Sequence, residues 1–207
     1  MIRNALTIDV EDYFQVSAFD PYIPRDDWDS IPCRVERNID RILSLLEKKG
    51  INATFFTLGW IAKRYPSMVR RIVENGHELA SHGCDHDRVT ELGSDEFYKD
   101  IADSKKILED ISGFPVIGYR APSFSINKQN YWALNLLEEA GYLYSSSIYP
   151  VHHDHYGIPD APRFAFYPNP TGKLLEVPIT TVNLLGRNIP VGGGGYFRLW
   201  PYTVSRW

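Results

Sequence analysis

The chain has 207 residues, 43% hydrophobic and 23% charged, so it is long enough to bury a core and too apolar for a disordered protein. Its 22 basic and 26 acidic side chains give a net charge of −4, which argues against nucleic-acid binding, since proteins that bind nucleic acids usually carry a basic field. No apolar stretch approaches the roughly 20 residues that a transmembrane helix needs. The chain reaches Asp9 before a signal-peptide core could form, and Cys33 and Cys84 are too few for a disulfide scaffold. We therefore expect a soluble cytoplasmic domain with free thiols, although export by another route stays open.

Short apolar runs alternate with segments of helical periodicity along most of the chain. The first strand is expected at residues 5–8, and a helix follows at 33–49, where Gly50 supplies a stop signal. Further strands are expected at 53–57, 77–80, 116–119, 142–148 and 174–177, and further helices at 66–75, between Ser94 and Gly113, and between Asn127 and Gly141. This alternation predicts parallel strands with right-handed crossovers, in a doubly wound sheet or a barrel.

Acidic, histidine and arginine side chains follow three of the expected strands at their carboxyl ends. They are Asp9, Glu11 and Asp12 after the first strand, His82 and His86 after the third, and Arg120 after the fourth. Both candidate architectures place their functional sites at the carboxyl ends of parallel strands. We therefore expect these side chains to share one site.

His82 and His86 are four residues apart, a spacing that lets two imidazoles face one cation. Two histidines and one carboxylate form a usual catalytic set for a divalent metal with an open position for water. A second, unligated carboxylate would then take a proton from that water, and Arg120 could pair with it and set its orientation. The alternative is a solvated loop beside an acidic capping cluster, with no metal bound.

Three other segments carry weaker signals. The histidines at 152, 153 and 155 could line the same cleft or lie in a merely polar loop. The glycines at 192–195 lack the Lys-Ser/Thr that follows a phosphate-binding loop, so a tight turn or a substrate-side loop is expected. Aromatic side chains in the first long loop could stack on sugar rings or pack against the core; they are Tyr13, Phe14, Phe19, Tyr22 and Trp28.

Taken together, the motifs resemble the polysaccharide deacetylase family, carbohydrate esterase family 4, also called the nodulation-deacetylase homology domain. The resemblance rests on T-I-D-V-E-D at residues 7–12, on the His82 and His86 pair, and on R-A-P at 120–122. A-T-F-F-T at 53–57 is similar to the second strand of the family. Later segments are similar to a subgroup associated with bacterial exopolysaccharide loci, and the likeness extends from about residue 5 to the last residue.

The resemblance implies a distorted, incomplete (β/α) barrel of six or seven parallel strands. It also implies a metal-dependent hydrolase that removes N-acetyl groups from the amino sugars of a polysaccharide or oligosaccharide. Asp9 matches the catalytic base of the family, His82 and His86 match the metal ligands, and Arg120 matches the arginine that orients the base. Zinc is the first expectation for the metal, with cobalt, nickel and manganese as alternatives.

The third metal ligand and the substrate contacts are less directly implied. Val10 stands where the family usually has a second aspartate, so either Glu11 or Asp12 must serve, and Glu11 is favoured by relatives with a D-x-D or D-x-E spacing. Substrate contacts are expected from four residues: Tyr13, Pro122, Ser123 and His155.

Two departures from the family pattern bear on activity. The subgroup usually has an acid where this chain has Ser145, and the late L-x-H motif, whose histidine protonates the leaving amine, has no counterpart after His155. Either the chain is a fragment, or His153 or His155 substitutes, or the protein does not turn over. We expect one catalytic domain over residues 1–207 that lacks its C-terminal part. The alternatives are an amidohydrolase acting on a small amide or ureide, and a non-catalytic glycan-binding module.

Overall fold

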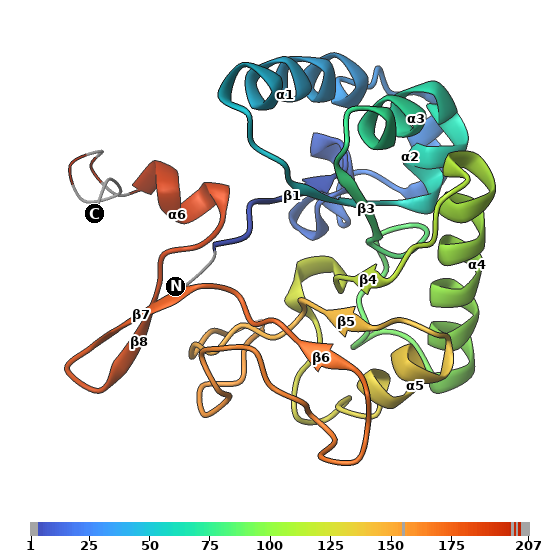
Figure 1. Cartoon of the computed structure of the whole chain (residues 1–207). Helices are drawn as coiled ribbons and strands as arrows, with labels where there is room; N and C mark the ends of the chain where they lie inside the picture. The colour runs from blue at the N-terminus through green and yellow to red at the C-terminus, as the bar shows by residue number, and fades with distance from the viewer. Residues whose placement is uncertain (1–3, 155, 200, 202, 204–207) are drawn as a thin grey trace.

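Six parallel strands, arranged in chain order, form the main sheet of the protein. The computed structural model describes residues 4–154, 156–199, 201 and 203. The strands are β1 (Thr7–Val10), β2 (Thr54–Thr57), β3 (Glu78–Ser81), β4 (Gly118–Tyr119), β5 (Tyr144–Ser145) and β6 (Leu175–Glu176). Each strand pairs in parallel with the next, and within the described residues no pairing joins β6 back to β1 (Figure 1). The expected incomplete barrel is therefore confirmed.

Helices connect these strands along the outer side of the sheet (Figure 1). They are α1 (Val35–Lys49), α2 (Gly59–Arg64), α3 (Pro66–Glu74), α4 (Ser94–Ser112) and α5 (Ala133–Glu139). Short 3₁₀ helices follow β1 and β4; they are η1 (Tyr13–Gln15), η2 (Ser17–Phe19), η3 (Arg25–Ser30) and η4 (Pro122–Phe124). After β6 the chain forms an antiparallel hairpin, β7 (Thr181–Leu184) with β8 (Arg187–Pro190), and then α6 (Gly194–Leu199), which extend away from the sheet (Figure 1).

Helix α1 shows why the periodic segments were predictable. Its apolar residues Val35, Ile39, Leu43 and Leu46 recur at helical spacing, and all four are buried. Gly50 adopts φ +61° after the last turn, the left-handed conformation that glycine enters without steric cost. Residues 33–49 therefore match the observed helix to within two residues.

Helix starts and short elements differ from the sequence expectation. Ser94 is the first residue of α4 rather than its cap, because the N–H of Gly93 bonds Glu96 Oε2 at 3.0 Å. The helix expected to start at Asn127 begins only at Ala133, since the Asn127 side chain accepts the N–H of Gln129 in a local turn. Helix α2 was missed because its first four residues are all buried, which leaves no amphipathic period to detect. The β7–β8 hairpin and α6 were also not predicted.

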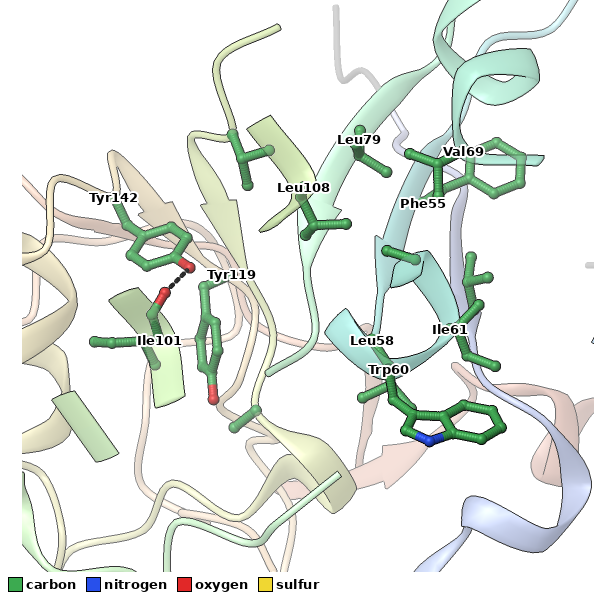
Figure 2. Packing of buried hydrophobic residues seen from close by; sticks show 14 of the residues in the cluster. Phe55, Leu58, Trp60, Ile61, Val69, Leu79, Ile101, Leu108, Tyr119 and Tyr142 are labelled. Atoms are coloured by element: carbon green, nitrogen blue, oxygen red, sulfur yellow. Dashed lines mark hydrogen bonds between the residues drawn. The ribbon is translucent and has the colours of Figure 1, made fainter. Parts of the chain in front are cut away.

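The core lies between the sheet and its helices, and it includes part of the aromatic first loop (Figure 2). Phe14, Trp28 and Trp60 are buried and meet edge to face, with ring centroids 5.7–6.0 Å apart. Tyr13, Phe19 and Tyr22 remain exposed. The first-loop aromatics therefore divide between core packing and the surface. On the other side of the core, the Tyr142 hydroxyl donates to the carbonyl of Ile101 at 2.8 Å (Figure 2).

Two further expectations concern thiols and membranes. Cys33 and Cys84 are free thiols, as predicted. Among the described residues, every helix is too short or too polar to span a bilayer.

Gly118 in β4 leads to a stability prediction. A Cβ atom at this position would lie 2.2 Å from the ring of Tyr144, whose hydroxyl is fixed by a 2.9 Å hydrogen bond to Glu78. We expect Gly118→Ala to lower the free energy of unfolding by about 1–3 kcal/mol, the usual cost of overpacking. Denaturant unfolding measures this, and the double variant with Tyr144→Leu should show a smaller loss than the sum of the two single variants. Strict additivity would contradict the explanation.

Candidate active site

An ion pair joins the end of β1 to the residue that follows β4. Arg120 Nη1 lies 2.6 Å from Asp9 Oδ1, and the arginine side chain is only 5% exposed. Burial alone would raise the pKa of Asp9, but the charge and hydrogen bond of Arg120, with contributions from His82 and His86, outweigh it and lower that pKa below its usual value. Asp9 is therefore ionised at neutral pH.

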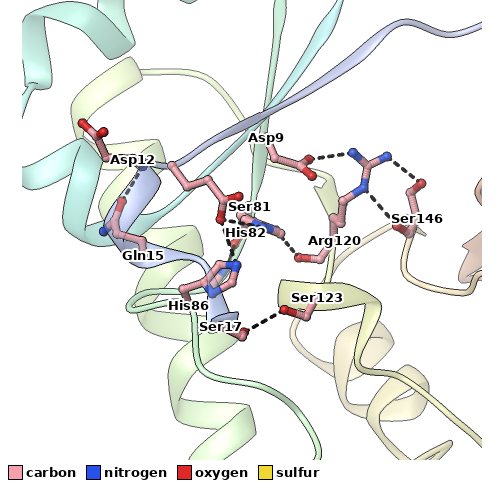
Figure 3. Close-up of polar contacts among 12 residues, drawn as sticks. Asp9, Asp12, Gln15, Ser17, Ser81, His82, His86, Arg120, Ser123 and Ser146 are labelled. Atoms are coloured by element: carbon pink, nitrogen blue, oxygen red, sulfur yellow. Dashed lines mark hydrogen bonds and ion pairs between the residues drawn. The ribbon is translucent and has the colours of Figure 1, made fainter. Parts of the chain in front are cut away.

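Arg120 is held from two further directions. Its Nε donates to the carbonyl of Ser146 at 3.1 Å, and its Nη2 donates to Ser146 Oγ at 2.9 Å (Figure 3). Its guanidinium carbon lies 4.0 Å from the centre of the Phe56 ring, a cation–π distance. These contacts fix the plane of the guanidinium, and through it the orientation of the Asp9 carboxylate.

Glu11 and the two histidines converge beside this ion pair. Glu11 Oε2 lies 2.8 Å from His86 Nε2 and 3.8 Å from His82 Nε2. The three ligand atoms lie within 4.8 Å of one another, and no other group of His, Cys, Asp or Glu in the described part of the chain meets that condition. Donors that follow β1 and β3, which lie on either side of β2 in the sheet, therefore face one point.

The state of His82 and the contacts of Glu11 suit a divalent cation. His82 Nδ1 bonds the carbonyl of Arg120 at 2.8 Å, which places the ring proton on Nδ1 and leaves the Nε2 lone pair toward Glu11. Burial lowers the pKa of His82 against the opposing effect of Asp9 and Glu11, so the neutral ring is favoured. Glu11 Oε2 is buried and makes no well-aligned hydrogen bond to any described residue. Two histidines and one carboxylate with this unsatisfied oxygen fit a bound divalent metal.

The backbone between the two histidines turns sharply around Asp100. Gly83 adopts φ +79°, and a Cβ there would lie 2.9 Å from Asp100 Oδ2, so glycine is required. The N–H of Cys84 donates to Asp100 Oδ1 at 2.9 Å, and burial raises the pKa of the Cys84 thiol, which disfavours a thiolate ligand. His86 itself has φ +63°, and this turn brings its ring centroid to 5.4 Å from that of His82.

Asp12, the other candidate third ligand, is occupied by backbone contacts. Its Oδ1 accepts the N–H of Tyr13 at 2.9 Å, and its Oδ2 accepts the N–H groups of Arg34 and Val35, the latter at 2.9 Å. The side chain is buried and lies away from the histidines (Figure 3). Asp12 therefore caps η1 and anchors the start of α1, whereas Glu11 lies with the histidine pair.

The expected substrate contacts are placed in different surroundings. Tyr13 is 41% exposed, with the Arg34 guanidinium 4.5 Å from its ring centre, and Pro122 is buried at the start of η4. Ser123 has φ +52°, and its hydroxyl bonds that of Ser17 at 2.8 Å (Figure 3). His155 lies outside the described residues. A substrate role for these four residues stays a prediction.

The ring of His153 stacks on Tyr156 with centroids 3.9 Å apart. The expectation of a turn or loop over residues 192–195 is wrong for Gly194 and Gly195, which form the first turn of α6. Sequence reasoning missed Ser146 and Phe56, which hold Arg120. Phe56 lies in the A-T-F-F-T segment, but nothing in the sequence indicates that it or Ser146 contacts Arg120, because those contacts arise from the pairing of strands.

The chain matches a known protein family over its central part. A family model described as polysaccharide deacetylase matches residues 26–145, which is more than half of the chain. The chain belongs to the polysaccharide deacetylase family. The match contains His82, His86 and Arg120, while the Asp9 motif precedes it. A second model, described as a domain of unknown function, matches residues 146–207, and the boundary falls between β5 and β6 of one sheet.

Relatives of known name align with less than two thirds of their own length. The peptidoglycan-N-acetylglucosamine deacetylase PgdA of Listeria monocytogenes is 34% identical over 88 residues, covering 42% of this chain and 19% of that protein. The peptidoglycan-N-acetylmuramic acid deacetylase PdaC of Bacillus subtilis is 36% identical over 90 residues, covering 44% and 19%. The peptidoglycan deacetylase-like protein FGM2 of Gibberella zeae is 33% identical over 113 residues, covering 53% and 32%.

Solved structures support the fold over more of the chain. A Mycobacterium smegmatis protein, provisionally described as a polysaccharide deacetylase, matches with a TM-score of 0.65 and 27% identity, covering 85% of this chain and 58% of that one. A pseudoenzyme of carbohydrate esterase family 4 from Bacillus anthracis matches with a TM-score of 0.53 over 67% of this chain and 40% of its own. Its 21% identity shows a shared fold alone.

The contrast between Glu11 and Asp12 is testable with two variants. Glu11→Ala removes the carboxylate that faces the histidines, so zinc affinity should fall by more than about a hundredfold, beyond the loss typical of an outer contact. Unfolding stability without metal should change little.

Asp12→Ala should do the opposite. It leaves three backbone N–H groups without their acceptor and should cost about 2 kcal/mol of unfolding free energy with zinc affinity retained. Isothermal titration and denaturant unfolding of both variants check this. A loss of zinc affinity in Asp12→Ala at full stability would show that the roles are reversed.

Proposed function

We propose that this protein is a metal-dependent deacetylase that hydrolyses N-acetyl groups on the amino sugars of a bacterial polysaccharide. The observation that carries the proposal is the adjacency of two assemblies. One is the group of Glu11, His82 and His86, and the other is the Asp9 carboxylate oriented by Arg120. A polarising ion beside an unligated carboxylate is what hydrolysis of an amide requires.

A divalent metal held by Glu11, His82 and His86 would supply Lewis acidity toward the acetyl carbonyl and the attacking water. Asp9 is the proposed general base, because it is ionised and is held in place by Arg120 rather than by the histidines. The hydrogen bond from Arg120 uses Oδ1, so Oδ2 is the proposed proton acceptor. Arg120 also keeps Asp9 in its charged form as the substrate enters.

The substrate class and the metal are finer parts of the proposal. The named relatives are peptidoglycan deacetylases, which favours an N-acetylated glycan. The similarity of later segments to an exopolysaccharide subgroup favours a polymer of that kind. Zinc is the proposed metal, because two imidazoles and one carboxylate suit it. We also propose that residues 1–207 act as one catalytic domain, an inference supported by the pairing of β5 with β6 across the boundary of the two family models.

The roles of His82 and Asp9 can be separated by mutation. His82→Ala should abolish both zinc retention and acetate release from N-acetylated chitooligosaccharides. Asp9→Asn should retain zinc but lower kcat by about 10²–10⁴-fold, the range that a general base contributes. Metal analysis and acetate assays measure these effects. Unchanged activity in His82→Ala would refute the scheme, and loss of zinc in Asp9→Asn would make Asp9 a ligand.

The same assays distinguish the competing functions. Hydrolysis of small cyclic ureides without acetate release from glycans would indicate the amidohydrolase alternative. Glycan binding without acetate release at any loading of zinc, cobalt, nickel or manganese would indicate a binding module.

A further inference from the structure

A second buried acid, Glu176 in β6, lies outside the residues assigned above. Its side chain is fully buried, and its Oε2 makes no well-aligned hydrogen bond within the described chain. Its Oε1 accepts two backbone N–H groups, from Ser147 at 2.9 Å and from Ile148 at 2.8 Å. Burial of a carboxylate with one oxygen unsatisfied costs folding free energy, so the position of Glu176 needs a physical reason.

The segment that Glu176 binds is the one that holds Arg120. Ser146, which accepts two hydrogen bonds from the Arg120 guanidinium, directly precedes Ser147 and Ile148. Ser147 Oγ also accepts the N–H of Ala121, the residue after Arg120. Glu176 Oε1 therefore holds the two peptide groups that directly follow Ser146, the residue that accepts two hydrogen bonds from Arg120.

The strand register accounts for this placement. Glu176 pairs with Ser145, the last residue of β5, and the chain leaves the sheet immediately after it. Beyond that point, residues 146–148 have fewer ladder partners, and the Glu176 carboxylate supplies an acceptor to the segment. Burial raises the pKa of Glu176, while the two N–H donors, the Ser145 hydroxyl and the charge of Arg120 oppose that effect.

We propose that Glu176 is a positioning residue for the Arg120–Asp9 pair, acting through the peptide groups of Ser147 and Ile148. The inference rests on the proposed deacetylation for its effect on catalysis, but the orientation of Arg120 can be measured without turnover. Glu176 does not touch the proposed metal ligands, so it acts on the base and leaves metal binding intact.

Two conservative variants of Glu176 distinguish the effect of side-chain length from the effect of charge. Glu176→Gln keeps an oxygen at the same distance along the side chain, so both N–H groups stay bonded although the charge is lost. Glu176→Asp keeps the charge but is shorter by one methylene, so the acceptor withdraws from both N–H groups. A positioning role predicts that the glutamine variant behaves like the original protein and that the aspartate variant does not.

The primary measurement is the solvent exchange of the Arg120 Nε–H proton by nitrogen-edited NMR, with the signal assigned by its loss in Arg120→Lys. Exchange should speed up by at least about tenfold in Glu176→Asp and stay unchanged in Glu176→Gln, because only the former loosens the segment. Equal or greater loss of protection in Glu176→Gln, or no change in either variant, would overturn the proposal.

Kinetics provide the second measurement. In Glu176→Asp, kcat for acetate release should fall by about ten- to a hundredfold, as expected for a misplaced catalytic group, while KM and zinc affinity stay within about twofold. The loss should be much smaller in an Arg120→Ala background, because the effect passes through that side chain. An equal fold-loss of kcat in the presence of Arg120 and in the Arg120→Ala background would contradict a role that acts through Arg120. If the original protein releases no acetate while the NMR result holds, the proposed function fails and the positioning role stands.

Glu78 offers a matched control in the same sheet. It lies in β3, its Oε1 accepts the Tyr144 hydroxyl at 2.9 Å, and its Oε2 accepts the Thr54 hydroxyl at 2.6 Å. Neither contact reaches residues 146–148. Glu78→Gln and Glu78→Asp should therefore leave Arg120 Nε–H exchange and kcat unchanged, and an effect equal to that of Glu176→Asp would show a general loosening of the sheet.

Discussion

The placement of the Arg120 guanidinium is the constraint on which the candidate site depends. A buried positive charge is costly unless every donor that points inward finds an acceptor, and this arginine finds them at Asp9 and at both oxygens of Ser146. Those acceptors come from β1 and from the segment after β5, with β4 between them in chain order. The sheet order therefore matters for the chemistry, because a different order would leave the charge unpaired. The ionised state of Asp9 is a consequence of this arrangement.

The same residue connects the ion pair with the histidines. The backbone carbonyl of Arg120 accepts a hydrogen bond from His82 Nδ1, and the backbone N–H of Arg120 donates to the carbonyl of Ser81. The backbone of Arg120 thus sets the tautomer of one proposed ligand, while its side chain orients the proposed base. A shift of β4 against β3 would disturb both at once. β4 itself has only two residues, Gly118 and Tyr119, and each of them pairs with a neighbouring strand.

Elements with a repeating pattern were predictable, and elements set by single contacts were not. The apolar stripe and terminal glycine of α1 define the helix before any tertiary contact is known. By contrast, the late start of α5 depends on a side chain of Asn127 that turns back on its own backbone. The candidate site likewise contains residues that a sequence pattern predicts and residues whose role depends on single tertiary contacts. Asp9, His82 and Arg120 were recognisable by their positions at or just beyond the carboxyl ends of strands. Ser146 and Glu176 acquire their contacts only through the pairing of β5 with β4 and β6.

The different placement of Glu11 and Asp12 follows from the alternation of side chains along extended chain. Side chains alternate between two faces of extended chain, so Asp9 and Glu11 share one face and Val10 and Asp12 share the other. In the structure, Val10 and Asp12 are both buried, Val10 in the core and Asp12 against the start of α1. The face of Asp9 and Glu11 is the one that meets His82, His86 and Arg120. An acid at the second position after Asp9 therefore reaches the histidines, and the next acid is directed to a structural cap by the same geometry.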